Sequence, residues 1–342
     1  MKYPFRNLVF EGGGVKGVAY VGAMDVLERS GIVANIDRVA GTSAGALMAV
    51  MVGLGYGSDE IENIMMGIDF KKFMDGHFCL IRLFRKFGLY KGDYFRKLVA
   101  EIIKDKTGDG EVTFADIERM RTEGFLFKEI YLVGTDLSTG CSVVFNYENT
   151  PDMKIADAAR ISMSIPLMFG AVIDNDNVYV DGGLLANYPV KVFDIDRLVF
   201  DKNNARKTDY YDRINQSLLL IRTRKSQETA YVFNEETLGF RLDSKDNIEF
   251  YLRNGLDRKP RKIRNIVSYI KDLLVSLVDA QDNTHLHSDD WQRTVYIDTL
   301  DVGSTDFGID KEKKLDLVES GRRCTEAYLE WFEDDRKKKG DR

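Results

Sequence analysis

The chain has 342 residues, of which 44% are hydrophobic and 30% are charged, and its formal net charge is -6 at pH 7. This length is enough for one large α/β domain with or without an appended unit, and the acidic balance argues against nucleic acid as a partner, because nucleic-acid binders usually carry a basic excess. The three cysteines, Cys79, Cys141 and Cys324, are widely spaced and odd in number, so the sequence predicts neither a disulfide framework nor a zinc site.

The N-terminal residues predict no secretory signal. Residues 1–7 run directly into the first expected strand and lack the apolar core of such a signal. The chain also has no run of about 18 apolar residues that could span a bilayer. We therefore expect a cytoplasmic protein, with any membrane contact made peripherally from the aqueous side. Export by a non-Sec secretion machine stays open.

The first predicted strand, residues 8–10, leads into a glycine-rich loop and then a helix. The loop has the pattern Gly-Gly-Gly-x-Lys-Gly at residues 12–17, and the apolar spacing predicts a helix over residues 15–29 that ends near Gly31. Consecutive glycines let backbone N–H groups turn outward and let a substrate oxygen approach without meeting a Cβ. Such a loop suits an oxyanion hole, in which removing one donor costs roughly 3 to 4 kcal/mol of transition-state stabilisation.

The same loop also satisfies the dinucleotide-binding pattern Gly-x-Gly-x-x-Gly. That pattern requires an acidic residue about 20 positions further on, at the end of the second strand, to hold the ribose hydroxyls. Here the nearest acid, Asp37, lies at the beginning of the second predicted strand. No Gly-Lys-Ser or Gly-Lys-Thr follows the glycines, which argues against a Walker-type phosphate loop. A nucleotide-binding or lipid-binding protein without turnover is the alternative hypothesis from another class.

The second predicted strand, residues 36–40, ends in a Gly-x-Ser-x-Gly pattern that runs from Gly41 to Gly45. This pattern is typical of a sharp strand-to-helix turn that holds a serine hydroxyl at the end of a sheet. The apolar run over residues 44–51 predicts a buried helix, and its N-terminus favours negative charge beside Ser43. Ser43 is therefore the candidate nucleophile. The alternative is that these small residues only permit close packing.

Two stretches combine basic with apolar residues, as interfacial elements do. The first, residues 70–87, falls after the serine motif, where a lid is expected. The second, residues 258–278, combines a basic segment with an amphipathic helical pattern. Packing of the apolar side chains in the core is the alternative for both. The members of the first stretch are Phe70, Lys71, Lys72, Phe73, Phe78, Leu80, Ile81, Arg82, Leu83, Phe84, Arg85, Lys86 and Phe87.

A third motif follows the predicted strand at residues 178–180, where Asp181 precedes two glycines. A carboxylate at this strand end can accept the serine proton, although a plain turn residue is the commoner role of Asp-Gly. The usual base is histidine, but His77, His285 and His287 occur in no strand-end motif and are expected to be ordinary surface or loop residues. A Ser-Asp pair suits esters better than amides, because an ester's leaving group depends less on protonation.

The alternation of predicted strands and helices indicates an α/β fold with three layers, α/β/α, around a largely parallel central sheet. All three motifs fall at predicted strand ends, where such sheets bind ligands. The sequence Asp174–Asn177 lacks the later glycine and glutamate of a calcium loop, so it predicts a hairpin turn and no metal. The predicted strands are residues 8–10, 38–40, 129–133, 142–145, 178–180, 217–221 and 294–297.

In their order, the three glycine-bearing motifs resemble those of the patatin-like phospholipases. Residues 159–169 and 184–189 resemble the family's segments on either side of its aspartate, and the resemblance covers roughly residues 5 to 200. It implies a patatin-like catalytic core over residues 1–200. Residues 201–342 are then expected to be an extension that completes the sheet and adds helices.

The resemblance further implies a serine hydrolase that cleaves fatty-acyl esters of phospholipids or other lipids, without metal or cofactor. Small-ester carboxylesterase or acyltransferase activity is the alternative among enzymes. Carried onto this chain, the family's roles make Ser43 the nucleophile and Asp181 the base, with an oxyanion hole at Gly12, Gly13 and Gly14 and the turn around the nucleophile flanked by Gly41 and Gly45.

Overall fold

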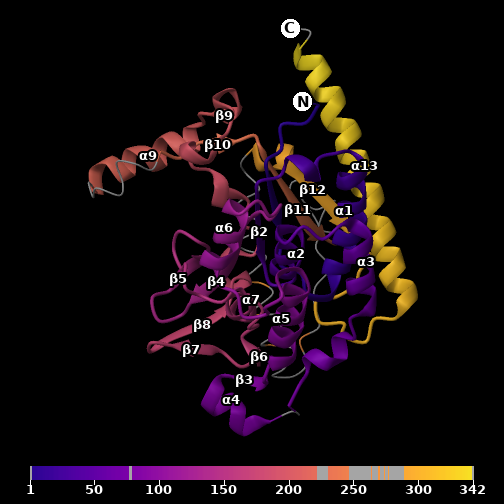
Figure 1. The fold of residues 1–342 in the computed structure, drawn as a ribbon, viewed down its shortest axis with the longest axis vertical. Coiled ribbons are helices and arrows are strands. Elements are labelled where there is room, and N and C mark those ends of the chain that lie inside the picture. The colour runs from indigo at the N-terminus through magenta and orange to yellow at the C-terminus, as the bar shows by residue number, and fades with distance from the viewer. Residues whose placement is uncertain are drawn as a thin grey trace.

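A central β-sheet with helices packed around it forms the body of the molecule (Figure 1). The computed structural model describes residues 2–76, 79–221, 230–245 and 289–340, with four isolated positions at 263, 269, 273 and 276. The sheet has the strand order β12-β11-β1-β2-β4-β8-β7, and β5 pairs with β4. Its strands are β1 (Asn7–Phe10), β2 (Arg38–Thr42), β4 (Glu129–Asp136), β5 (Cys141–Phe145), β7 (Val172–Asp174), β8 (Asn177–Asp181), β11 (Thr237–Asp243) and β12 (Thr294–Asp298).

The sheet is parallel over most of its width. All neighbouring pairs from β12 to β4 are parallel, whereas β5 and β8 both pair antiparallel with β4, and β7 pairs antiparallel with β8. The central strands are buried on both faces, which explains why β1 reads as an uninterrupted apolar run. The predicted α/β fold with a largely parallel sheet is confirmed.

Successive side chains of a strand point to opposite faces of the sheet, and the two faces here have different covers. Leu8 and Phe10 join the large core beneath the helices, whereas Val9 joins a smaller cluster with Ala40 and Tyr131 on the other face. That smaller cluster packs against a segment with two 3-10 turns, η4 (Val190–Phe193) and η5 (Asp196–Leu198). The segment that follows Asp181 thus covers one face of the sheet.

The helices differ in how deeply they are buried. All ten residues of α2 are buried, as its apolar sequence predicts, and the long α13 lies along α1 at the side of the molecule (Figure 1). The helices are α1 (Tyr20–Arg29), α2 (Ala44–Gly53), α3 (Ser58–Gly67), α4 (Leu80–Lys86), α5 (Asp93–Thr107), α6 (Phe114–Thr122), α7 (Ile155–Ser162), α8 (Gly183–Ala186), α9 (Asp209–Ile221) and α13 (Lys311–Gly340).

Short elements complete the chain between these helices and strands. Two small ribbons pair β3 with β6 and β9 with β10. The short elements are η1 (Gly14–Ala19), η2 (Val33–Asn35), η3 (Phe70–Phe73), η6 (Lys202–Asn204), η7 (Asp289–Arg293), β3 (Gly88–Tyr90), β6 (Leu167–Phe169), β9 (Ala205–Arg206) and β10 (Phe233–Asn234). None of the described helices is long and apolar enough to cross a membrane.

Most predicted elements exist, with some differences. The expected hairpin turn is present between β7 and β8, where Asn175 and Asp176 both have positive φ. The expected strand at residues 217–221 is wrong, because this run ends α9. A short apolar run fits a strand and a helix equally well, so its pattern could not decide between them. The amphipathic stretch at residues 258–278 lies outside the described residues, apart from four isolated positions.

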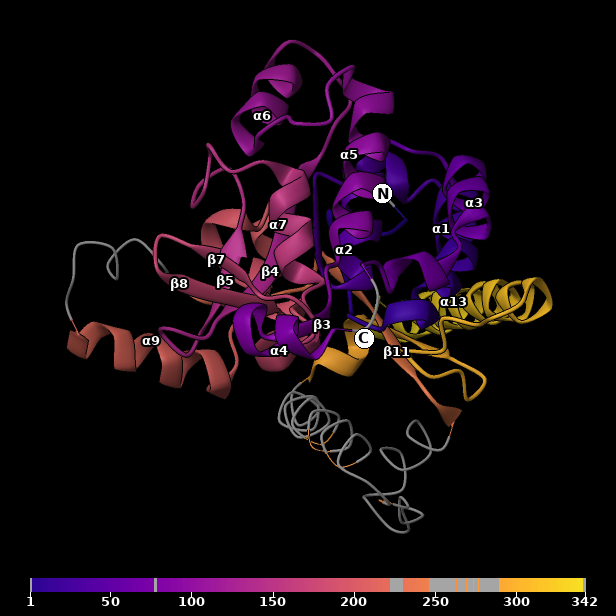
Figure 2. The ribbon, with the colours of Figure 1, turned by 90° about the horizontal axis from the view of Figure 1, so that it is seen from below.

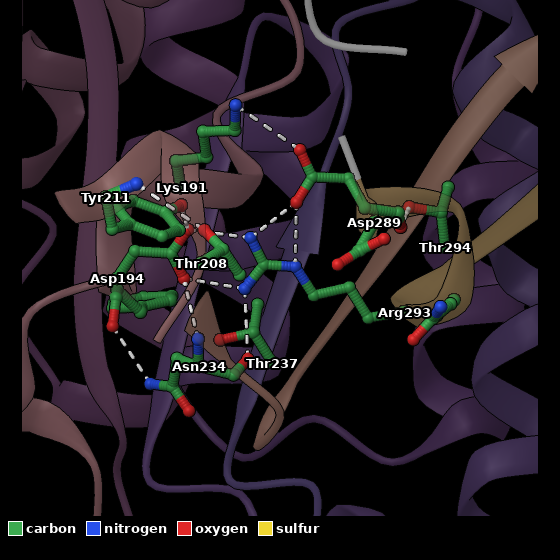
Figure 3. Close-up of polar contacts among 12 residues, drawn as sticks. Lys191, Asp194, Thr208, Tyr211, Asn234, Thr237, Asp289, Arg293 and Thr294 are labelled. Atoms are coloured by element: carbon green, nitrogen blue, oxygen red, sulfur yellow. Dashed lines mark hydrogen bonds and ion pairs between the residues drawn. The ribbon is translucent and has the colours of Figure 1, made fainter. Parts of the chain in front are cut away.

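A buried network of charged groups joins the C-terminal part of the chain to the segment after Asp181 (Figure 3). The guanidinium of Arg293 donates to both carboxylate oxygens of Asp194, at 2.6 and 2.7 Å, and to Asp290 Oδ1 at 2.6 Å. Tyr211 also donates its hydroxyl to Asp194. The network fixes residues 188–198 against the end of β12. Removing one member would leave a buried charge without its partner, which typically costs about 3 to 5 kcal/mol.

Candidate active site

Ser43 occupies a strained turn between β2 and α2. Its φ of 55° and ψ of -121° are unusual for a residue with a side chain, and such strain is found at functional sites more often than elsewhere. A Cβ at Gly41 would lie 2.1 Å from the Gly45 carbonyl oxygen, and a Cβ at Gly45 would lie 2.3 Å from the Phe10 carbonyl oxygen. The turn therefore packs directly against β1, and it needs glycine on both sides of the serine.

The register of the sheet brings Asp181 next to Ser43. Thr42, which ends β2, pairs with Val133 of β4, and the next residue of β4, Gly134, pairs with Asp181 at the end of β8. A Cβ on Gly182 would lie 3.0 Å from the Thr42 side chain, which confirms how closely the two strand ends meet. One strand, β4, thus places the predicted nucleophile and the predicted base side by side.

The Asp181 carboxylate is almost completely buried. Its Oδ1 accepts a hydrogen bond of 2.7 Å from the Gly183 N–H, whereas its Oδ2 has no hydrogen-bond partner among the described residues. Burial raises the pKa of Asp181 to about 7, against the opposing effects of the Gly183 N–H and the Ser43 hydroxyl. A carboxylate whose pKa lies near neutrality is a far better proton acceptor than an ordinary aspartate.

The Ser43 hydroxyl is close to Asp181 but is not aligned with it. Its hydrogen-bond geometry favours the Met163 sulfur, at 3.6 Å from Oγ. A hydroxyl hydrogen rotates to suit its surroundings, and catalytic hydrogen bonds in free enzymes are often long or poorly aligned until substrate binds. The Ser43 N–H, by contrast, is fixed by a 2.9 Å hydrogen bond to Ser162 Oγ.

The glycine-rich loop lies against Ser43. A Cβ on Gly12 would lie 3.2 Å from the Ser43 Cβ, so the loop and the serine touch. The Gly12 N–H donates to the Asn187 carbonyl at 3.0 Å, so the expectation that all three glycines offer donors is wrong for Gly12. The N–H groups of Gly13 and Gly14 have no acceptor within the described part of the chain. These two remain the candidate oxyanion donors.

Two polar residues that the motif analysis did not single out hold the loop in place. Asn187 donates from Nδ2 to Glu11 Oε1 at 3.2 Å and to the Gly12 carbonyl at 3.3 Å. Glu11 in turn accepts a 2.6 Å hydrogen bond at Oε2 from the Leu242 N–H. A charged residue directly between an apolar strand and a run of glycines is the signal that could have marked Glu11. Its partners come from β11 and from the turn after Asp181, which no local pattern connects.

The three histidines, His77, His285 and His287, lie outside the described residues. Over the described ranges, no group of histidine, cysteine, aspartate and glutamate side chains could hold a metal ion. What the described residues do bring together is a serine, a carboxylate with a free oxygen, and two free backbone donors. This arrangement is suited to acyl transfer.

Replacing Gly14 with alanine is expected to lower the turnover of a soluble ester by about 10²- to 10³-fold, the usual effect of losing one oxyanion donor. Gly14 has a φ of 56°, and an added Cβ would lie 2.0 Å from the Ser304 carbonyl oxygen, so the loop has to move. The control is Gly108→Ala, since Gly108 also has positive φ but has no atom near its Cβ position. Equal activity of the two variants would contradict the role of the loop.

The region that carries this geometry matches a known protein family. The model of the patatin-like phospholipase family matches residues 8–194, which is more than half of the chain. The chain belongs to the patatin-like phospholipase family. The matched region contains the glycine-rich loop, Ser43 and Asp181, so the family resemblance and the site coincide.

Several relatives are similar to this patatin-like chain over much of its length. Protein YqhO of Bacillus subtilis is 30% identical over 339 residues, covering 94% of this chain and 97% of YqhO. A probable lipid hydrolase, 463L of Invertebrate iridescent virus 6, is 27% identical and covers 60% of this chain and 68% of its own. The crystal structure of VipD from Legionella pneumophila superposes with a TM-score of 0.60 at 18% identity, covering 96% of this chain and 67% of VipD. Family membership and the likeness to the probable lipid hydrolase support lipid acyl hydrolase activity, and the likeness to VipD supports the fold.

Proposed function

We propose that this protein hydrolyses fatty-acyl esters of phospholipids, as a phospholipase A or lysophospholipase, with Ser43 as nucleophile and Asp181 as base. The observation that carries the proposal is the pairing of β2, β4 and β8, because the end of β2 before the strained Ser43 adjoins the end of β8 at Asp181, whose buried Oδ2 has no hydrogen-bond partner among the described residues. The pKa of about 7 supports the same assignment, because the carboxylate can then both take and return a proton near neutral pH.

In the first half of the reaction, Ser43 Oγ attacks the ester carbonyl carbon while Asp181 Oδ2 takes the hydroxyl proton. The carbonyl oxygen becomes an oxyanion that receives hydrogen bonds from the N–H groups of Gly13 and Gly14. The intermediate then collapses, the bond to the alkoxide oxygen breaks, and Asp181 returns its proton to that oxygen. The lysolipid leaves as an alcohol, and the acyl group stays on Ser43.

In the second half, a water molecule attacks the acyl carbon and gives its proton to Asp181. Collapse of this second oxyanion breaks the bond to Ser43 Oγ, which takes the proton back from Asp181. The fatty acid is released and the serine is restored. One carboxyl group thus acts alternately as base and as acid, which a group with a pKa near 7 does well.

The proposal is tested by incubating the protein with mixed phospholipid liposomes and identifying the products by mass spectrometry. We expect fatty acid and lysolipid in equal amounts at early times. Protein treated beforehand with a fluorophosphonate, which modifies active serines, is the control and should release neither. Release of phosphorylated headgroup or diacylglycerol would contradict the proposal. Hydrolysis of a short-chain soluble ester with intact liposomes would instead indicate a carboxylesterase.

A further inference from the structure

Helix α4 and the ribbon of β3 and β6 project from the body of the molecule. They lie at the lower end of Figure 1, and Figure 2, seen from below, shows α4 at the front of the molecule. Gly88 of β3 pairs with Leu167 of β6, so Phe87, which follows α4, is the chain neighbour of the residue paired with Leu167. We call the exposed face formed by Ile81, Phe84, Phe87 and Leu167 the α4 face.

The α4 face is apolar and open to solvent. Phe84 is 81% exposed and Ile81 is 67% exposed, and their spacing of three residues puts them on one side of the helix. Phe87 and Leu167 are 48% and 37% exposed. Both hold positive φ, which is uncommon and strained for bulky residues. A folded chain rarely presents neighbouring large apolar side chains to water unless they contact something else.

Part of the basic and aromatic stretch is not available for such a contact. Phe70 and Phe73 are only 4% and 3% exposed, and Phe73 packs its ring against Phe95 and Phe307. For the first turn of the stretch from residue 70 to 87, the alternative of packing in the core is therefore the one that holds. The exposed apolar surface begins at α4.

Basic side chains are frequent in the sequence that contains α4 and β3. Residues 70–91 contain six lysine or arginine residues and one acid, Asp75, in a chain whose net charge is -6. Five of the basic side chains are exposed, namely Lys71, Lys72, Arg85, Lys86 and Lys91. Local positive charge beside exposed phenylalanine and isoleucine matches an anionic lipid surface, in which the rings enter the headgroup region and the cations bind the phosphates.

The projection is also connected to the candidate active site. The Lys86 and Tyr90 carbonyls accept hydrogen bonds of 2.9 Å from the N–H groups of Ala171 and Gly170. The buried Arg160 donates to the carbonyls of Lys91 and Gly170.

The segment between Arg160 and Gly170 contacts both Ser43 and Asp181. Within it, the Met163 sulfur lies 3.6 Å from Ser43 Oγ. The Ser164 carbonyl accepts the Asp181 N–H at 2.9 Å. A membrane that contacts α4 therefore also lies close to the segment that packs against Ser43.

We propose that the α4 face is the surface by which this protein docks on anionic phospholipid membranes and delivers lipid to Ser43. The inference rests on the proposed function for its substrate, but the docking itself is measured without turnover. Ser43 and Asp181 are only 5% and 4% exposed. A lipid therefore reaches them only if the segment between Arg160 and Gly170 moves aside. When α4 docks on a membrane, the membrane also comes into contact with the segment between Arg160 and Gly170.

The test compares vesicle binding with hydrolysis of a soluble short-chain ester. Phe84→Ser combined with Phe87→Gly should weaken sedimentation with vesicles of phosphatidylcholine and phosphatidylglycerol by at least about tenfold, because two aromatic rings that enter the membrane in the proposed complex are lost. Glycine adopts the positive φ of residue 87 without strain, so Phe87→Gly is expected to leave the fold intact. Arg85→Glu with Lys86→Glu should weaken binding to the anionic vesicles while changing the weak binding to pure phosphatidylcholine little. Hydrolysis of the short-chain ester should change less than twofold in each.

A matched control is Phe125→Ser with Leu126→Ser, because these residues are 49% and 89% exposed in the loop after α6. It should bind vesicles like the unaltered protein. Undiminished binding by the α4 variants would overturn the proposal, as would lipid-free self-association that Phe84→Ser abolishes, since a second copy would then occupy the face. Loss of short-chain ester hydrolysis in folded α4 variants would also overturn it. Vesicle binding that depends on α4 in a protein that hydrolyses no ester would support docking and refute the proposed function.

Discussion

Replacement of Ser43 by alanine is expected to abolish labelling by a fluorophosphonate probe and to lower ester hydrolysis by at least about 10⁴-fold, because loss of the nucleophile removes covalent catalysis. The fold should survive. Within the described part of the chain, the Ser43 hydroxyl donates one hydrogen bond, a weak one of 3.6 Å to the Met163 sulfur, and alanine adopts the backbone conformation of residue 43 no less readily than serine does. In-gel fluorescence, fatty-acid release and the melting temperature together check this result.

The control for this variant is Ser142→Ala, which removes a serine hydroxyl from an exposed position of β5. Its labelling and hydrolysis should match those of the unaltered protein. Persistent labelling of Ser43→Ala would show that another residue is the nucleophile. Replacing Ser43 with glycine gives a second inactive variant, and it should be no less stable than Ser43→Ala because glycine relieves the strain at φ 55°.

Replacement of Asp181 by asparagine is expected to lower kcat by about 10³-fold, the usual contribution of a positioned general base. Asparagine keeps the size of the side chain and an oxygen for the Gly183 N–H, so the geometry is retained while the proton acceptor is lost. In the unaltered protein, activity should rise with pH and level off above about 7, where Asp181 is ionised. The residual activity of the variant should lack this transition. Undiminished kcat would end the assignment of Asp181 as base.

The same residue predicts an effect on stability. Since the pKa of Asp181 is raised from 3.8 to about 7 in the folded protein, the folded state keeps a proton that the unfolded chain loses between these values. The free energy of unfolding therefore falls as pH rises through this window, by up to about 1.4 kcal/mol per pH unit, and this contribution stays lost above pH 7. Asp181→Asn carries no such penalty.

Thermal denaturation at pH 5 and pH 8 measures the difference between the two proteins. The stability of Asp181→Asn relative to the unaltered protein should be larger at pH 8 than at pH 5. A parallel pH dependence of the two melting temperatures would show that the carboxyl group titrates at its ordinary pKa. An active-site group that lowers the stability of its own fold is the expected signature of a functional residue.

The elements that carry the motifs could be predicted from sequence because their signals are local. The apolar run of β1, the buried helix after Ser43 and the two-residue turn before β8 each follow from side-chain spacing or turn chemistry within a few residues. Strand β11 was not predicted, because its local sequence pattern is not that of a strand. Its sequence carries Gly239, Arg241 and Asp243, which read as polar and flexible, yet both charged side chains are buried against one another.

The sequence by itself determined which residues could act, since Ser43 between two glycines and Asp181 before two glycines are recognisable without a structure. Only the tertiary structure decided that the strand ends that carry them lie side by side, that Gly12 has no free donor, and that burial raises the pKa of Asp181 to about 7. These properties depend on strands paired across β4 and on the exclusion of water by residues from distant parts of the chain. Pairing and burial are long-range quantities, so no local pattern contains them.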